Sequence, residues 1–351
     1  FYLTANMKDI GFNALEKWTA GIGVTVPFGS LTEYPVNAPF RDSVVFNALP
    51  LIDIKPTLAY KLNDQLSFGL GADIYTFTTL FGEGHLEIKR RSSVTGADSE
   101  INGSGTGAGF NASMLYAPLR NAEGKPLANI GIVYRSQVAL PLSGQFIVNG
   151  ASAADARASM TLPQMITGAV AIWPVREQDR EWKLEMDVEH VRWKSFRSTN
   201  VALSQPVSGS NSIPLALNWK DSYNVMLGTE YKWLKLERLP EWEVAARAGY
   251  MHIQSQMSDA TFNPGIPSAD QHIPSVGLGV TCNENGTFLG FKCGSLGAKA
   301  VGLDLSYQIA YYEDRTVSGQ VTSTTAGTNA AINGTYRSTI HAGGVSLRFN
   351  F

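Results

Sequence analysis

Residues 182–190 decide the fold, and they read Trp182-Lys183-Leu184-Glu185-Met186-Asp187-Val188-Glu189-His190. Every second residue from Trp182 to Val188 is apolar, and every residue between them is charged. Successive side chains of an extended strand point to opposite faces, so this segment has one apolar face and one ionisable face. Segments 301–312 and 345–351 repeat the alternation. The pattern predicts long β-strands that each turn one face toward an apolar environment.

The composition excludes several classes of protein. Only 17% of the 351 residues are charged, and the net charge is -2, whereas ordinary globular domains carry roughly 25% charged residues. These values argue against disorder, a helical bundle and nucleic-acid binding. A membrane-spanning helix needs about 20 predominantly apolar residues, and the longest candidate, 158–175, is interrupted by Pro163, Gln164 and two threonines. A membrane-spanning antiparallel β-barrel therefore remains as the predicted fold.

A sandwich of two antiparallel sheets is the alternative, because its apolar faces would meet in a core. Two features favour the barrel. The strands are longer than the usual five or six residues, and tryptophans recur near their ends, as in the aromatic girdles of outer-membrane barrels. We place strands near 1–8, 16–28, 51–62, 66–80, 106–117, 128–148, 157–173, 182–199, 219–233, 241–256, 270–282, 299–315 and 334–351.

The connections alternate in length. Short turns such as 63–65 alternate with long polar connections at 29–50, 81–105, 200–218 and 316–333, and outer-membrane barrels have short periplasmic turns and long external loops. Thirteen strands beginning at the outer surface conflict with an even-stranded barrel, so we expect a further strand upstream of Phe1, giving about fourteen. Any N-terminal plug would then also lie outside this chain. Residues 1–351 are expected to form a single barrel domain.

The sequence resembles the FadL/TodX family of outer-membrane transporters over essentially its whole length. The matching pieces are Pro27-Phe28-Gly29-Ser30-Leu31-Thr32-Glu33-Tyr34, Ile54-Lys55-Pro56-Thr57-Leu58-Ala59-Tyr60, Tyr134-Arg135-Ser136, Lys220-Asp221-Ser222-Tyr223, Leu227-Gly228-Thr229-Glu230-Tyr231, Arg247-Ala248-Gly249-Tyr250, Ile266-Pro267 and Phe349-Asn350-Phe351. The resemblance implies a barrel of about fourteen strands with an N-terminal hatch. It also implies uptake of long-chain fatty acids or aromatic hydrocarbons across a Gram-negative outer membrane. Where the family commonly has Asp-Arg, this chain has Asp270-Gln271-His272, so we transfer no cationic ligand role to that position.

Pro27 interrupts a segment that otherwise has the pattern of a strand. Proline cannot donate to a β-ladder, and one interpretation is that Pro27 ends the strand before the long connection. The resemblance implies instead a kinked strand that opens the wall sideways into the bilayer at Val26, Pro27, Phe28 and Gly29. Burying apolar area is worth roughly 25 cal/mol per Å², so a dry pocket with a sideways exit keeps an apolar cargo covered throughout.

The candidate ligand contacts are cationic and aromatic. Arg135 and Arg247 are candidates for holding a carboxylate by charge-assisted hydrogen bonds, and Phe28, Phe77, Phe81 and Phe110 for contacting an apolar tail. The alternative for the inward-facing charges is a solvated or salt-bridged lumen wall. Lys89, Arg90 and Arg91 lie in a predicted external loop, where we expect them to meet lipopolysaccharide phosphates or solvent.

Cys282 and Cys293 lie in one connection, and their number and proximity predict a disulfide. Zinc is the alternative, but no histidine is near in sequence. Residues 103–107 imitate a phosphate-binding loop without its lysine, so we expect no nucleotide, no other cofactor and no metal. A monomeric passive transporter is the leading hypothesis. The others are an aqueous porin, a barrel-embedded hydrolase and a soluble sandwich.

Overall fold

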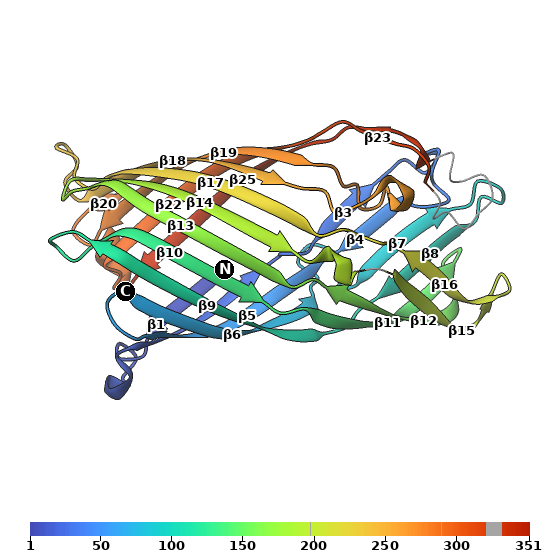
Figure 1. Ribbon diagram of the computed structural model, residues 1–351, viewed down its shortest axis with the longest axis horizontal. Helices are drawn as coiled ribbons and strands as arrows, with labels where there is room; N and C mark the ends of the chain where they lie inside the picture. Colours follow the sequence, from blue (N-terminus) through green and yellow to red (C-terminus); the bar gives the residue numbers. More distant parts are fainter. Residues whose placement is uncertain (197, 289, 321–331) are drawn as a thin grey trace.

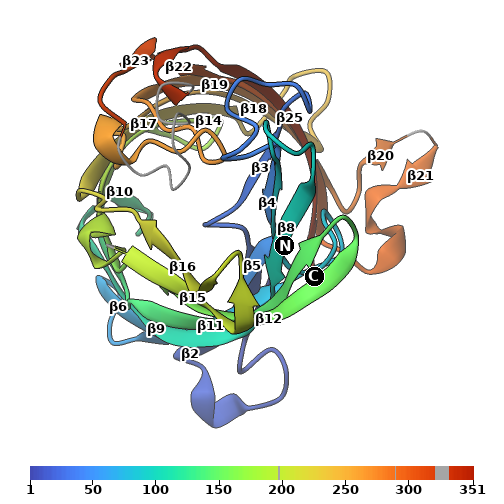
Figure 2. The same ribbon diagram turned by 90° about the vertical axis from the view of Figure 1, so that its right-hand side faces the viewer.

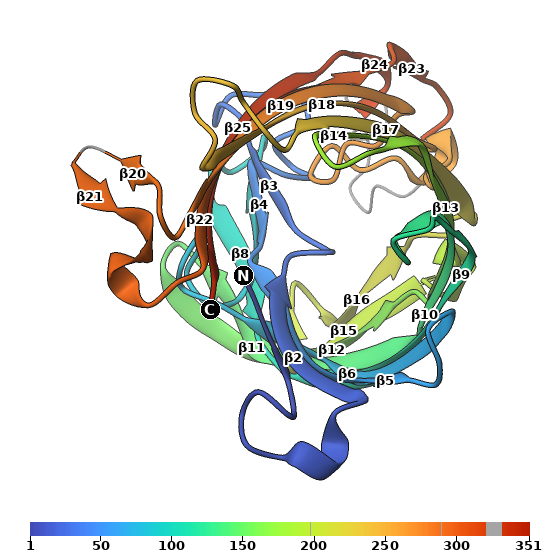
Figure 3. The same cartoon turned by 90° about the vertical axis from the view of Figure 1, so that its left-hand side faces the viewer.

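The computed structural model describes residues 1–351 except 197, 289 and 321–331 (Figure 1). Thirteen antiparallel strands form one sheet that curls into a barrel (Figures 2 and 3). In order they are β1 (Tyr2–Asn6), β2 (Trp18–Thr25), β5 (Leu51–Lys61), β6 (Leu66–Phe77), β9 (Gly107–Arg120), β10 (Pro126–Arg135), β13 (Met165–Arg176), β14 (Arg180–Val191), β17 (Ser222–Trp233), β18 (Trp242–Ile253), β19 (Gln271–Asn283), β22 (Ala300–Tyr312) and β25 (Thr339–Asn350). Each predicted barrel strand has its counterpart here, and the predicted all-β transmembrane barrel is confirmed.

The alternation of side chains along the strands is the one that the sequence predicts. On β14, Met186 and Val188 are 49% and 39% exposed on the outer face of the barrel. The residues between them face the lumen, where Lys183 Nζ lies 2.6 Å from Glu185 Oε2. Glu189 accepts hydrogen bonds from Thr167 on β13 and Asn224 on β17. The polar side chains on the lumenal face therefore form ion pairs and hydrogen bonds with one another, while the apolar side chains on the outer face contact lipid.

A second sheet of eight strands extends the barrel beyond the end where the long connections lie; we call it the mouth sheet and this end the mouth (Figures 1 and 2). Its order is β16 (Ser210–Ala216), β15 (Ser198–Val207), β12 (Ala151–Leu162), β11 (Val138–Val148), β8 (Asp98–Gly103), β7 (Leu86–Arg91), β4 (Phe46–Leu49) and β3 (Ser30–Glu33). The opposite end, with short connections such as that between β5 and β6, is the turn end.

The mouth sheet corrects several predicted boundaries. The connections predicted at 29–50, 81–105 and 200–218 contain β3 and β4, β7 and β8, and β15 and β16. The strand predicted at 128–148 bends at Ser136 and divides into β10 and β11. The strand predicted at 157–173 divides at Pro163, because proline has no backbone N–H for the ladder. The strand predicted at 182–199 ends at Val191 and is followed by a short 3-10 helix.

The remaining elements are short. They are the hairpins β20 (Thr287–Phe288) with β21 (Phe291–Lys292) and β23 (Arg315–Val317) with β24 (Gly334–Tyr336), and the 3-10 helices η1 (Asn13–Leu15), η2 (Trp193–Ser195), η3 (Asp259–Thr261) and η4 (Cys293–Leu296). Most of the connection predicted at 316–333 lies outside the described residues. None of the helices in the described part of the chain is both long and apolar enough to cross a bilayer.

The packed apolar core lies at the mouth, where the barrel meets the mouth sheet. Its first cluster joins Phe28 and Leu51 to Tyr75 on β6, Leu140 on β11 and Leu162 on β12. A second cluster lies within the mouth sheet around Ala154 and Val201. Leu51 and Leu140 are fully buried. The described residues therefore concentrate their buried apolar surface at the mouth.

Candidate functional site

The mouth sheet, the 3-10 helix η2 and the loop 254–270 enclose an apolar cavity of about 320 Å³. Its size is at the lower end of the range typical of small-molecule pockets, about 300–1,000 Å³. The wall of the cavity is largely aliphatic and includes Leu49, Leu86, Ile88, Leu142 and Leu162. We call this space the mouth cavity. An apolar molecule that enters it exchanges contact with water for contact with hydrocarbon side chains, which is favourable.

Aromatic rings form one corner of the mouth cavity. Trp193 of η2 lies edge-on to Phe28, with ring centroids 5.7 Å apart, and edge-on to Trp219, with centroids 5.0 Å apart. Phe196 packs against Trp219 at 4.8 Å. Edge-to-face pairs at these distances are favourable beyond the area they bury. The rings therefore hold Phe28 in a fixed position in the wall, with 9% of its surface exposed.

One cation of a basic triplet lines the mouth cavity. Lys89 Nζ lies 2.6 Å from Glu87 Oε1, and Arg91 NH1 lies 3.2 Å from Asp98 Oδ1. Arg90 lines the cavity instead, and its buried Nε has no hydrogen-bond partner among the described residues. Burial lowers the pKa of the Arg90 guanidinium, because the charged form loses solvation. The expectation that the triplet meets phosphates or solvent does not hold for Arg90, which lines the cavity.

The β-ladder is interrupted beside the mouth cavity at residues 26–29. Pairing between β2 and β5 ends at Thr25 with Asp53, and pairing between β3 and β4 begins at Ser30 with Leu49. The stretch between these points has no strand pairing, and Pro27 within it has no backbone N–H to offer. Pro27, Phe28 and Gly29 line the mouth cavity, whereas Val26 is 50% exposed. The predicted opening residues therefore separate the cavity from the outside of the wall.

The two arginines predicted to hold a ligand lie outside the mouth cavity. Arg247 projects from β18 into the lumen, where its Nε lies 2.6 Å from Glu230 Oε2 and its NH1 lies 2.6 Å from Asp304 Oδ1. Asp304 also pairs with Arg348 at 2.9 Å. Arg247 is thus part of a salt-bridged lumen wall, as the alternative interpretation holds. Arg135 is the last residue of β10 and does not line the mouth cavity either.

The predicted aromatic contacts are divided between several places. Phe28 lines the mouth cavity, and Phe77 packs against the core cluster behind it. Phe81 is 46% exposed. Phe110 is 49% exposed and packs on Tyr134 at 5.7 Å. Phe110 alternates on β9 with the buried Asn111, which donates to Asp73, so the two side chains project from opposite faces of the sheet.

A second cavity, of about 360 Å³, lies in the lumen between β14, β17, β18, β19 and β22. Charged and polar side chains line it, including Lys183, Glu185, Glu230 and Arg247. Its lining is more polar than that of the mouth cavity, and polar groups of this kind can hold water.

The loop 254–270 borders the mouth cavity and is held in place by Arg315 of β23. The Arg315 guanidinium lies 2.8 Å from Asp259 Oδ1 and donates to the backbone oxygens of Met257 and Ser268. Gln256 and Ile266 of the same loop contribute to the cavity lining. A single side chain thus fixes one wall of the cavity by several bonds.

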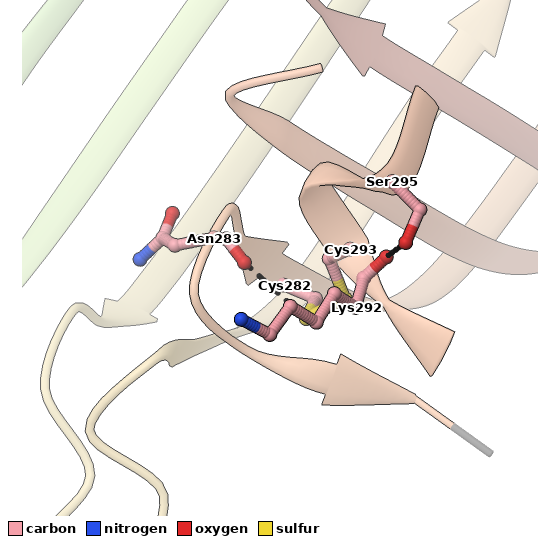
Figure 4. The surroundings of a disulfide bond; sticks show 5 residues. All are labelled: Cys282, Asn283, Lys292, Cys293 and Ser295. Carbon is pink, nitrogen blue, oxygen red and sulfur yellow. Dashed lines mark hydrogen bonds between the residues drawn. A yellow bond between two sulfur atoms is a disulfide. The ribbon is translucent and has the colours of Figure 1, made fainter. Parts of the chain in front are cut away.

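Cys282 and Cys293 form a disulfide at the turn end, with an S–S distance of 1.98 Å (Figure 4). The described part of the chain brings one group of possible metal ligands together: the donor atoms of Glu83, His85 and Glu87 lie within 4.8 Å of one another. The ammonium group of Lys89 already contacts Glu87, so a cation of the protein itself occupies that side of the group.

Known proteins resemble this chain in sequence over most of its length. A family model described as "Outer membrane protein transport protein (OMPP1/FadL/TodX)" matches residues 6–340. A long-chain fatty acid transport protein of Escherichia coli O6:H1 is 23% identical over 298 residues, covering 76% of this chain and 63% of the relative. That of Salmonella typhi is 24% identical over 240 residues, covering 60% of this chain and 52% of the relative. The chain thus spans only part of the length of either relative.

Solved structures have the same fold. A FadL homologue from Pseudomonas aeruginosa superimposes with a TM-score of 0.70 at 16% identity, covering 99% of this chain and 76% of the homologue. The toluene transporter TodX of Pseudomonas putida gives a TM-score of 0.58 at 17% identity, covering 96% of this chain and 80% of that one.

Proposed function

This chain belongs to the OMPP1/FadL/TodX family of outer-membrane transport proteins, and from that membership we propose that it takes up hydrophobic small molecules passively through the outer membrane of a Gram-negative bacterium. The mouth faces the exterior, since outer-membrane barrels have their longer connections outside. No cofactor or nucleotide takes part, because binding and release of an apolar cargo are driven by burial of its surface.

The observation that carries this proposal is that the mouth cavity reaches residues 26–29, where strand pairing is missing. We call these four residues the ladder gap. Cargo binds first among the aliphatic and aromatic side chains of the cavity. It then passes residues 26–29, where no strand pairing has to be broken, and enters the bilayer sideways. The cavity wall is largely apolar and residues 26–29 carry no polar side chain, so the cargo keeps contact with apolar surface between capture and release.

Arg90 supports a cargo that carries an acidic head group. Its buried Nε lacks a hydrogen-bond partner among the described residues, and a carboxylate would supply a charge-assisted bond to it. The aliphatic wall would then contact the tail. Long-chain fatty acids combine both parts, and the two curated relatives bear the name long-chain fatty acid transport protein. We therefore place fatty acids ahead of aromatic hydrocarbons as the cargo.

Replacing Gly29 by Arg tests the sideways exit. A Cβ at this position would lie 2.9 Å from Val26 Cγ1, so a long charged side chain must project into the gap or the cavity. Gly29→Arg should abolish uptake of a labelled fatty acid by cells, although the barrel still inserts in the outer membrane. Leu31→Arg is the matched control, because Leu31 is 70% exposed and does not line the cavity. Unchanged uptake by Gly29→Arg would exclude this exit.

An aqueous porin is the second candidate, and the polar cavity in the lumen favours it. Swelling of liposomes in small sugars distinguishes the two functions, because a porin passes sugars freely. The transporter proposed here should cause no swelling and should bind a fatty acid in detergent solution.

A further inference from the structure

Two connections at the turn end stand out sideways from the barrel wall (Figures 2 and 3). The first arm, residues 7–17, joins β1 to β2 and contains η1. The second arm, the described residues of 284–299 (289 is not among them), joins β19 to β22 and contains β20, β21 and η4. Other connections at this end, such as 121–125 and 177–179, are short turns. Neither arm takes part in the mouth cavity or in the ladder gap.

Both arms expose large apolar side chains. On the first arm, Ile10 and Phe12 are 53% and 54% exposed. On the second arm, Phe288 and Phe291 are 53% and 75% exposed. Apolar surface held in water is unfavourable. These side chains occur in pairs on two separate arms. An apolar environment that both arms reach would stabilise them.

The second arm is crosslinked at its base and packs against the outer wall of the barrel. The Cys282–Cys293 disulfide ties its base together, as Figure 4 shows, and the Phe288 ring packs on Trp242 with centroids 5.8 Å apart. Trp242 is the first residue of β18 at the turn end, the level at which outer-membrane barrels carry an aromatic girdle. The apolar surface of the arm thus extends the surface that the barrel presents to lipid.

Basic side chains accompany the apolar ones. Lys17 is exposed on the first arm and Lys292 on the second, whereas Lys8 pairs with Glu16 at 3.5 Å and Lys299 donates to the backbone oxygen of Phe351. Lysine can bury its aliphatic stem in an apolar layer and keep its ammonium group among phosphates. Segments that combine apolar and basic side chains in this way bind at the boundary between headgroups and acyl chains.

We propose that the two arms are membrane-interface anchors that lie in the periplasmic leaflet of the outer membrane. The bilayer surrounds the barrel on all sides, so a segment that leaves the wall sideways at the turn end runs along this leaflet. Phe12 and Phe291 then insert below the phospholipid headgroups, and Lys17 and Lys292 contact the phosphates. The arms belong to connections close to the two edge strands of the sheet, β1 and β25, so they fix the depth and tilt of that side of the barrel.

Photo-crosslinking from single positions tests this proposal on the full chain. The photoreactive residue p-benzoyl-phenylalanine replaces Phe12 or Phe291, and the protein is reconstituted in liposomes of phosphatidylethanolamine and phosphatidylglycerol. Glu123 is the matched control position, because it is exposed in the short turn between β9 and β10 at the same end. After irradiation, intact-mass measurement counts adducts of one phospholipid, and the heat-dependent gel mobility of barrels confirms folding.

The anchors predict lipid adducts at positions 12 and 291 in several-fold excess over position 123. Equal and low yields at all three positions would overturn the proposal, because the arms would then lie in water. Crosslinked dimers at position 12 or 291, in place of lipid adducts, would also overturn it and identify a second copy of the chain as the occupant. Either result leaves uptake through the mouth cavity unaffected.

Discussion

Arg90→Gln is the change that most directly tests how the mouth cavity recognises its cargo. Glutamine keeps a polar side chain of moderate length but removes the positive charge. Arg90 lines the cavity, and its Nε has no hydrogen-bond partner among the described residues, so few contacts within the protein are lost. The change should therefore act on the bound carboxylate rather than on folding.

The expected loss follows from the strength of a charged hydrogen bond. Such bonds contribute about 1.5–3 kcal/mol net, and about 1.4 kcal/mol corresponds to a tenfold change in affinity. A long-chain fatty acid should thus bind Arg90→Gln about 10- to 100-fold more weakly. The corresponding fatty alcohol, which has the same tail and no charge, should bind both proteins nearly equally.

Trp193 and Trp219 in the wall of the cavity provide the assay, because their fluorescence reports on occupancy. Acid and alcohol are titrated into the detergent-solubilised protein, and the ratio of their affinities is compared between variants. Arg91→Gln is the control, since Arg91 pairs with Asp98 and does not line the cavity. An equal loss for acid and alcohol, or no loss for either, would refute the assignment of Arg90 to the head group.

Three further outcomes are expected at other places in the molecule. Arg315→Met breaks the ion pair with Asp259. Hydrogen exchange in the loop 254–270 should therefore become faster, while exchange in the barrel strands stays slow. Continued protection of the loop in this variant would argue against its anchoring by Arg315. Replacing Cys282 and Cys293 by Ser removes a crosslink worth at most about 3 kcal/mol, and faster exchange should be confined to the second arm. Burial raises the pKa of Tyr336 to about 12 from 10.0. The folded state therefore retains the phenolic proton to higher pH than the unfolded state. The corresponding contribution to the stability of the region around Tyr336 is lost as the pH rises from about 10 to about 12. Phenolate absorbance should show this late ionisation, and Tyr336→Phe should remove the accompanying loosening.

The barrel could be predicted from the sequence because its strands alternate with a period of two. Segments such as 182–190 and 301–312 carry the whole signal locally, and each has its strand in the structure. The mouth sheet could not be predicted in this way. Strand 98–103, for example, is short and polar and pairs on one side with residues 146–148, far away in sequence, and this dependence on context is typical of β-structure.

The candidate site was predicted only in part. Pro27 marks the ladder gap because proline has a fixed chemical consequence wherever it occurs in a strand. Arg90 gives no such signal, since it lies between Lys89 and Arg91 in a basic run. Alternation on β7 turns it away from both neighbours, and this could have been found only after recognising a strand at 86–91. The ion pairs of Arg247 also gave no local signal, because its partners Glu230 and Asp304 lie on other strands.

The missing pairing at residues 26–29 has a consequence for how the protein can evolve. Side chains in the rest of the wall are constrained by the strand on either side, so an exchange there alters the barrel itself. The four residues of the gap carry no such constraint from the ladder, and their bulk can change without the loss of a backbone bond between strands. Under the proposed sideways exit, selectivity for larger or smaller molecules can therefore change at these residues, most readily at the exposed Val26, without any change to the paired strands of the barrel.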